Sequence, residues 1–199
     1  MLLETLQIGG QFNSIKNKTG ATNFPTNLTK IAAKLINTSI KTAKQSHHHR
    51  FKVGSTLYTQ NNDTGSYLSY ANKIPRTLRK NSQYGSNFTP NDPDITKVGD
   101  GHPTVHGEFR ILYGSDPDAE CTIIGCNTPL CANCMKTAIM RGVDAIIVDE
   151  ASLPGNTRGP LNTSNPWSED RKELWFTLCC ELARMAKVPV YSVRDTADP

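Results

Sequence analysis

The 199-residue sequence lacks a hydrophobic run long enough to cross a membrane, and it lacks a strong excess of charge. Its formal net charge is only +4, well short of the basic footprint typical of dedicated nucleic-acid-binding domains, so contact with phosphates is permitted but not demanded. The first residues carry neither a basic segment nor a sustained apolar core, and we expect no signal peptide. With 37% apolar and 20% charged residues, the composition is typical of a soluble globular domain.

Cysteine is absent from the first 120 positions, and all six cysteines follow. A disulfide framework is one interpretation, but the chain is not small, and Cys179 and Cys180 are adjacent within a helical pattern. Reduced thiols fit this distribution better, so we expect a cytoplasmic protein.

The chain begins with a weakly patterned segment, residues 1–26, which we interpret as an N-terminal arm before a single domain over residues 27–199. Apolar residues then recur at helical spacing and predict a helix from Leu28 to Ala43. The lysines of this segment lie largely off the apolar face and indicate either a solvated surface or a phosphate-binding ridge. The histidines at 47–49 are expected in a loop, because adjacent side chains diverge.

Two short apolar segments, residues 50–59 and 66–71, are predicted to pair as a β-hairpin around a turn at 61–65. A long polar loop, residues 73–101, follows. It mixes cations with aromatic rings, which suits holding a phosphate and stacking a base, although a merely solvated loop remains open. The residues concerned are Arg76, Arg79, Lys80, Tyr84 and Phe88.

The most informative stretch contains the parts of a catalytic zinc site. His106 precedes Glu108 by two residues, and Cys131 and Cys134 form a C-x-x-C pair. A catalytic zinc site uses three protein ligands, keeps a fourth position for water, and has a carboxylate nearby that moves protons. These four residues supply three soft or borderline ligands and one such carboxylate.

The predicted secondary structure makes this ligand set plausible. Cys131 and Cys134 are three residues apart, so they share one face in the first turn of a helix predicted over residues 130–141. A helix N-terminus favours thiolate, the form that zinc binds. His106 opens a second predicted helix, residues 106–113. Two helix starts that face each other could therefore deliver three ligands to one ion.

The H-x-E and P-x-C-x-x-C elements together resemble the signature of the cytidine deaminase-like superfamily, which comprises zinc-dependent deaminases of nucleosides, nucleotides and nucleic acids. The resemblance implies that His106, Cys131 and Cys134 hold Zn²⁺. It also implies that Glu108 is catalytic, taking a proton from water and returning protons to a ring nitrogen and to the departing ammonia.

Other features bear on the substrate. The Phe-Lys-Val-Gly run before the hairpin resembles the opening of free-nucleoside cytidine deaminases, which implies substrate-binding roles for Phe51 and Asn72, although the downstream Asn-x-Glu of that family is absent. The backbone N–H of Gly107 is expected near the base, because glycine permits close approach. In one departure from the family, Leu130 stands where a proline directly precedes the first cysteine, Cys131. This change affects the substrate contact there more than the metal.

The C-terminal part predicts a buried strand at 144–149, a loop at 151–166, a helix at 167–187 and a last strand at 188–193, parallel to the previous one. A helix before the last strand resembles the branch of the superfamily that holds nucleotide, tRNA and polynucleotide deaminases. The helix carries an apolar stripe that we expect in the core, formed by Leu174, Trp175, Leu178, Cys179, Leu182 and Ala186.

Other kinds of site are open at this point. A closed structural zinc site could use Cys121, Cys126, Cys131 and Cys134, and it would need no acid–base residue. A chain without any metal is also open.

We therefore predict an α/β protein with the three-layer α/β/α cytidine deaminase-like fold, whose mixed sheet has about five strands with the last two parallel. The predicted function is zinc-dependent hydrolytic deamination of a cytosine-containing nucleoside or nucleotide, with Zn²⁺ as cofactor and a homo-oligomer among the expected states. One alternative is a polynucleotide deaminase acting on cytosine or adenine, for example a secreted toxin or effector domain. Another is a catalytically silent binding protein of the same fold.

Overall fold

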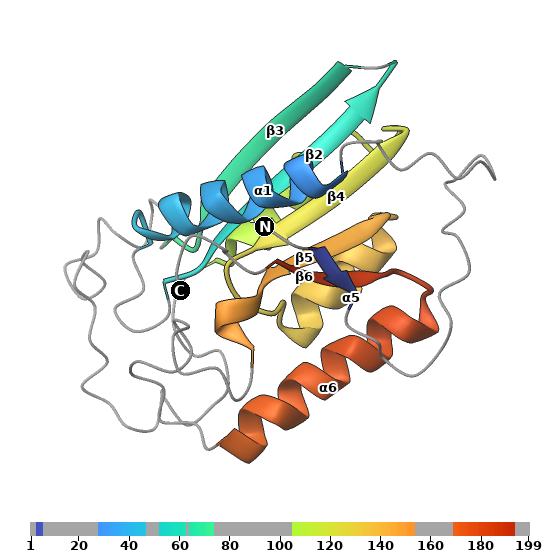
Figure 1. Ribbon diagram of the computed structural model, residues 1–199. Coiled ribbons are helices and arrows are strands. Elements are labelled where there is room, and N and C mark those ends of the chain that lie inside the picture. Colours follow the sequence, from blue (N-terminus) through green and yellow to red (C-terminus); the bar gives the residue numbers. More distant parts are fainter. Residues whose placement is uncertain are drawn as a thin grey trace.

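The structure is a computed structural model that describes residues 3–5, 28–46, 52–62, 64–73, 105–153 and 169–193. Its helices and strands alternate along the chain in the manner of an α/β protein (Figure 1). In chain order they are β1 (Leu3–Thr5), α1 (Leu28–Ala43), β2 (Gly54–Asn61), β3 (Thr64–Ala71), α4 (Gly107–Tyr113), β4 (Cys121–Cys126), α5 (Ala132–Met140), β5 (Ala145–Asp149), the 3-10 helix η2 (Glu150–Ser152), α6 (Glu169–Met185) and β6 (Val190–Val193).

The strands form one mixed sheet in the order β1-β6-β5-β4-β2-β3. The β2–β3 hairpin is antiparallel, and β2 also pairs antiparallel with β4. From β4 onward the sheet is parallel, since β4 pairs with β5 and β5 with β6. The predicted five-strand mixed sheet with two parallel strands at its end is confirmed, and β1 adds a short antiparallel strand beside β6.

Helices cover the two faces of the sheet (Figure 1). Helix α1 lies on one face, where Leu35 packs among residues of β2, β4 and β5. Helices α4, α5 and α6 lie on the other face, over a second buried cluster. The two clusters alternate along the strands, so that Ile123 faces α1 while Ile124 faces the opposite helices. The predicted three-layer α/β/α class is thereby confirmed.

The contact between α1 and the sheet is close and partly polar. A Cβ atom on Gly125 would lie 2.6 Å from the Cβ of Leu35, so only glycine allows this approach of helix and strand. The Ser39 hydroxyl is fully buried in the contact and donates to the Gly125 carbonyl at 3.1 Å. It also makes a 3.0 Å hydrogen bond with the hydroxyl of Thr56. These contacts fix the helix against the middle of the sheet.

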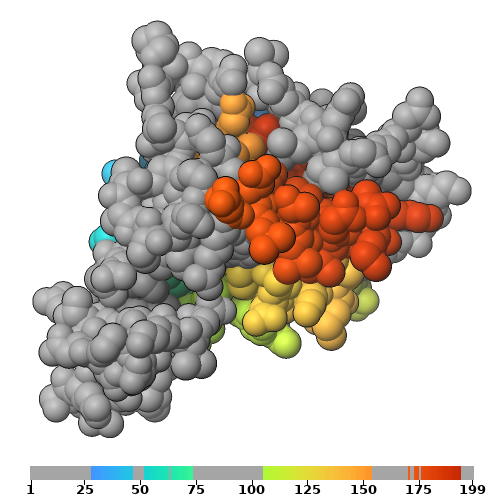
Figure 2. Space-filling model, turned by 90° about the horizontal axis from the view of Figure 1, so that it is seen from below, coloured from blue at the N-terminus to red at the C-terminus, as the bar shows by residue number. Residues whose placement is uncertain are grey.

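The predicted apolar stripe of α6 is only partly correct. Leu174 and Leu178 are 71% and 49% exposed, and Ala186, just beyond the helix, is exposed as well. Cys179 is buried as predicted, and Leu182 packs partly buried against the core. Cys180 and Ala183, which were not part of the predicted stripe, are buried as well, and the side chain of Trp175 lies outside the described residues. Figure 2 shows α6 along the surface of the molecule beside α5.

Several predictions lie outside the described residues. They concern Phe51, the histidines at 47–49, nearly all of the loop at 73–101 and most of the loop at 151–166. The predicted first strand of the hairpin is shifted, because β2 begins at Gly54 and continues to Asn61. Within the described part of the chain, no helix combines the length and the hydropathy that crossing a membrane requires.

Candidate metal centre and active site

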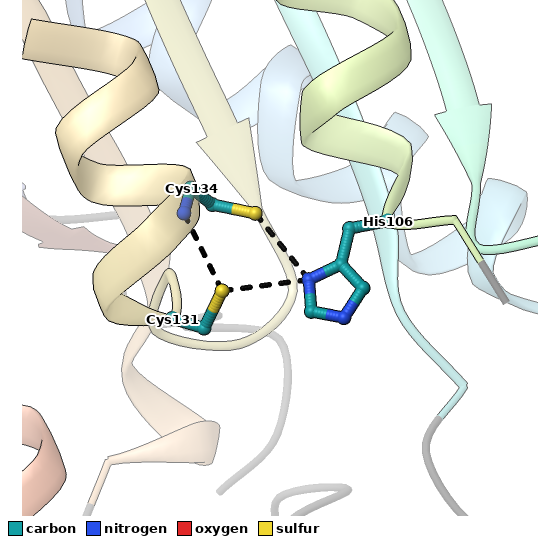
Figure 3. A group of neighbouring side chains, drawn as sticks. All are labelled: His106, Cys131 and Cys134. Atoms are coloured by element: carbon teal, nitrogen blue, oxygen red, sulfur yellow. Dashed lines mark hydrogen bonds between the residues drawn. The ribbon is translucent and has the colours of Figure 1, made fainter. Parts of the chain in front are cut away.

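His106 is the N-cap residue of α4, with extended backbone angles (φ −62°, ψ 140°). Its side chain makes no capping hydrogen bond to the helix. The imidazole instead faces α5, where its Nδ1 atom lies 3.3 Å from the Sγ of Cys134 and 3.4 Å from the Sγ of Cys131 (Figure 3). The helix start thus projects a histidine ring across to the neighbouring helix start.

Cys131 occupies the same position on the other helix. It is the N-cap of α5, and its sulfur accepts a hydrogen bond from the backbone N–H of Cys134 at 3.4 Å. The sequence interpretation placed the helix start at Leu130, and this is wrong: α5 begins at Ala132. Cys131 has extended angles (φ −69°, ψ 160°) because an N-cap residue lies outside the helix and uses its side chain to cap it. Both thiols still belong to one helix start.

The cluster fits a zinc ion. The candidate ligand atoms of His106, Cys131 and Cys134 all lie within 4.8 Å of one another. Ligands held at about 2.0–2.3 Å around a tetrahedral ion lie roughly 3.5–3.8 Å apart, close to the two nitrogen–sulfur distances above. One imidazole and two thiols are also a donor set that zinc prefers, and three protein ligands leave a fourth position for water.

The alternative of a closed four-cysteine site is not supported by the geometry. In the described part of the chain, His106, Cys131 and Cys134 form the one metal-binding group of three or more His, Cys, Asp or Glu. Cys121 lies in the buried cluster beneath α1, on the opposite face of the sheet. All six cysteines are free thiols, which also excludes the disulfide framework in this structure.

The two thiols of the cluster differ in acidity. The pKa of Cys131 is lowered to about 4, chiefly by a hydrogen bond from the Cys134 thiol and further by His106. The pKa of Cys134 is raised, because its thiol donates that hydrogen bond and because it is buried. Cys131 is thus stabilised as a thiolate by groups on the two helix starts, which is the form that a metal ligand requires.

Glu108 lies beside the cluster, in the first turn of α4, and is only 2% exposed. One carboxylate oxygen, Oε1, accepts a hydrogen bond from the thiol of Cys126 at 3.7 Å. The other, Oε2, is buried without a hydrogen-bond partner among the described residues. Burial raises the pKa of the Glu108 carboxyl. A raised pKa suits a carboxyl group that has to accept and donate protons near neutral pH.

The start of α4 is held on the edge of the sheet. A Cβ atom on Gly107 would clash with the carbonyl oxygen of Tyr70 in β3, so glycine lets the helix start touch the strand. Just before the helix, Lys73 and Val105 exchange two backbone hydrogen bonds at 3.1 and 3.0 Å. These contacts fix the position of His106.

The loop between β4 and α5 is held at both ends. The buried Asn127 side chain accepts from the Gly54 backbone at 2.9 Å and donates to the Lys52 carbonyl at 3.0 Å. At the other end, the Cys179 thiol of α6 donates to the Leu130 carbonyl at 2.7 Å. The inserted Leu130 is itself almost fully buried. The loop therefore presents Cys131 from a fixed backbone.

The predicted substrate-binding residues have different surroundings. Asn72 is 3% exposed, and its Oδ1 accepts hydrogen bonds from the Ser46 hydroxyl and, at 3.2 Å, from the Val53 backbone. It thereby joins the end of α1 to the hairpin. Gly107 is buried against Tyr70. Phe51 is outside the described residues, and the substrate roles of all three stay predictions.

Sequence reasoning overlooked three supporting residues: Cys126, Asn127 and Cys179. Cys126 was considered only as a ligand of the alternative structural zinc site. Asn127 directly follows a buried strand, and this position could have indicated a loop anchor. Cys179 carries no comparable signal, because its partner is a backbone carbonyl 49 residues away.

A three-layer α/β/α fold with a His/Cys/Cys cluster at two helix starts is the architecture that the resemblance to the cytidine deaminase-like superfamily implied. No protein-family model matches the chain, and no curated protein matches it. Among solved structures, it is similar to the dCMP deaminase from the cyanophage S-TIM5 in apo form, with 17% identity over 82% of this chain and 98% of that one, and a TM-score of 0.49.

The structure of that enzyme in complex with dCMP and dUMP is also similar, with 13% identity over 86% of this chain and 100% of that one, and a TM-score of 0.45.

Proposed function

We propose that this protein is a zinc-dependent hydrolytic deaminase that acts on a cytosine-containing nucleoside or nucleotide. The observation that carries the proposal is the pairing of a three-residue ligand cluster with a buried carboxylate beside it, whose Oε2 has no partner among the described residues. A silent binding protein of the same fold would have no need of a buried acid at Glu108, because burying a carboxylate costs free energy.

In the proposed reaction, His106, Cys131 and Cys134 would hold the zinc ion. A zinc ion held there would act as a Lewis acid and would make a water molecule acidic enough to act as a nucleophile near neutral pH. Oε2 of Glu108 accepts a proton from the water molecule. Glu108 then passes this proton to the ring nitrogen next to the carbon that carries the amino group.

The water oxygen forms a bond to the carbon that carries the amino group. The carbon–nitrogen bond then breaks as Glu108 transfers the second proton of the water to the amino group, so that ammonia leaves and a carbonyl remains. The raised pKa of Glu108 suits both directions of proton transfer.

The preference for a small cytosine substrate rests on the resemblance of a helix, the Phe-Lys-Val-Gly run and a hairpin to the opening of free-nucleoside cytidine deaminases, and in this chain α1 precedes the hairpin β2–β3. Phe51, Asn72 and Gly107 are the residues that we propose for substrate binding. A cytoplasmic location, in which the six free thiols would remain reduced, is also a proposal.

A polynucleotide substrate is the second candidate, because α6 crosses between the parallel strands β5 and β6, an arrangement that resembles the branch holding nucleotide, tRNA and polynucleotide deaminases. The two candidates differ in salt dependence. Binding to a phosphate chain releases counterions and weakens steeply as salt is added, whereas a single nucleotide makes few phosphate contacts.

The test is an ammonia-release assay of the zinc-loaded protein with nucleosides, nucleotides, single-stranded DNA and single-stranded RNA at two salt concentrations. We expect turnover of free cytosine compounds that changes little with salt. Glu108→Ala and Glu108→Gln should abolish turnover while the zinc content stays at one ion per chain. Turnover that survives these substitutions, or no ammonia from any substrate with the wild type, would refute the proposal.

A further inference from the structure

We propose that Cys126 is a positioning residue of the active site: its thiol holds Oε1 of Glu108 by a hydrogen bond, so that Oε2 is left to exchange protons. This inference rests on the proposed function, in which Glu108 is the proton carrier. Cys126 is the last residue of β4 and is 0% exposed. Its Sγ atom lies 3.7 Å from Oε1, within range of a sulfur hydrogen bond.

The surroundings of the sulfur determine the direction of that hydrogen bond. The hydroxyl of Ser55 in β2 lies 3.4 Å from Sγ, and the hydroxyl of Thr128 lies 3.7 Å from it. The Thr128 backbone N–H also donates to the sulfur. A thiol has a single proton but can accept several hydrogen bonds. The arrangement is satisfied when Ser55 and Thr128 donate to the sulfur and the S–H donates to Glu108.

Cys126 is able to donate because its thiol is fully buried, and burial away from water favours the neutral, protonated form of a thiol. The thiol also lies outside the group formed by His106, Cys131 and Cys134. It is therefore a neutral donor next to the metal ligands and is not one of them.

The consequence for catalysis is geometric. A buried carboxylate with both oxygens unpartnered could rotate between orientations, and only some of them aim an oxygen at the reacting water. The Cys126 thiol, fixed to the end of β4, holds one oxygen and thereby sets the direction of the other, together with the backbone N–H of Glu108, which also bonds the carboxylate. Each of the four side chains in this chain of contacts is buried: Ser55, Thr128, Cys126 and Glu108.

The first experiment compares Cys126→Ala and Cys126→Ser with the wild type, all zinc-loaded. We expect Cys126→Ala to lower kcat about tenfold, which corresponds to about 1.4 kcal/mol in the barrier, with KM and zinc content nearly unchanged. Cys126→Ser keeps a donor and should retain most of the activity. Cys121→Ala, a buried thiol of the same strand on the other face of the sheet, is the matched control and should keep the wild-type kcat.

The second experiment needs no substrate and follows the S–H stretching band of Cys126 by infrared difference spectroscopy between the wild type and Cys126→Ala. The band should be shifted to low frequency by the charged acceptor, and Glu108→Gln should move it back toward that of a thiol bonded to a neutral group. This result would support the bond even if no substrate were turned over, which would count against the proposed function alone.

Two outcomes would overturn the inference. One is an active wild type whose kcat is unchanged in Cys126→Ala. The other is a Cys126 band that does not respond to Glu108→Gln. If Cys126→Ala did not fold, Cys126→Ser, which also lacks the S–H group, would serve as the reference for the band, and its activity would test the role in catalysis. A loss of kcat in Cys126→Ser equal to that of Glu108→Gln would also contradict the inference, because serine can replace the thiol as a donor.

Discussion

The Nδ1 atom of His106 lies 3.3 Å from the Sγ of Cys134, although 28 residues separate them in the chain. Each residue sits at the start of its own helix, and the two helices follow different strands of the sheet. The contact exists because α4 and α5 pack side by side on one face, with their N-terminal ends together (Figure 3). The metal centre is therefore a property of helix packing, and several consequences can be measured.

The first prediction concerns metal binding. Zinc content should fall well below one ion per chain in each of three variants: His106→Ala, Cys131→Ser and Cys134→Ser. The reason is that the site has three protein ligands, and each substitution leaves only two to hold the ion. Zinc in large excess over its dissociation constant should stabilise the wild type by about 3 kcal/mol at a hundredfold excess, and a chelator should reverse this. Metal analysis and thermal unfolding with and without zinc measure both effects. Cys180→Ser, which replaces a buried thiol outside the ligand group, is the control and should bind zinc like the wild type.

The second prediction concerns the start of α4. Gly107→Ala should destabilise the protein by about 1–3 kcal/mol, because the added methyl group would clash with the carbonyl oxygen of Tyr70 and push the helix from β3. Zinc affinity should fall too, since His106 precedes this residue. Gly114→Ala at the other end of the helix is the control, because its added atom would lie 3.3 Å or more from its neighbours. Equal zinc affinity in the two variants would contradict this account.

The third prediction concerns the contact of α1 with the sheet. Ser39→Ala should cost about 1–3 kcal/mol in the free energy of unfolding, because it removes buried hydrogen bonds to Thr56 and to the Gly125 carbonyl. Urea unfolding measures the change. Ser66→Ala is the comparison, since the Ser66 hydroxyl bonds Thr59 in an exposed position and its loss should change stability little. A Ser39→Ala protein as stable as the Ser66 variant would show that these bonds contribute nothing net.

The fourth prediction concerns alkaline pH. Burial, and then Asp144, raises the pKa of the Cys121 thiol from 9.0 to about 12. Above about pH 9 the unfolded chain loses this proton while the folded protein keeps it, so stability is full below that pH and falls progressively toward about pH 12.

Cys121→Ala removes this titration. Between about pH 8 and about pH 10, the free energy of unfolding should therefore decrease less for the variant than for the wild type. The difference between the two decreases should be roughly 1 kcal/mol. Denaturant unfolding at the two pH values gives the difference. Parallel curves for wild type and variant would show that the Cys121 thiol titrates alike in the folded and unfolded chains.

Much of the fold could be read from local patterns. The helix at Leu28–Ala43 was predicted with its observed bounds, because its apolar residues recur at one helical spacing along its length. The parallel pairing of β5 and β6 followed from a strand, a helix and a strand in succession.

The face of α6 was predicted less well. Leu174 and Leu178 were expected inside because of their hydrophobicity, and both are exposed. Periodicity identifies a helix, but it does not say which of two neighbouring stripes packs against the sheet. Here Cys180 and Ala183, which lie outside the predicted stripe, are buried.

The sequence by itself determined which residues could bind a metal and carry a proton, because imidazole, thiol and carboxylate groups have their chemistry wherever they occur. The helices predicted over residues 106–113 and 130–141 also placed them at helix starts. Only the tertiary structure decided that His106 meets Cys131 and Cys134, and that the thiol of Cys126 faces Oε1 of Glu108. The reason is physical: these contacts join residues from different helices and strands, and their distances are set by packing across the sheet.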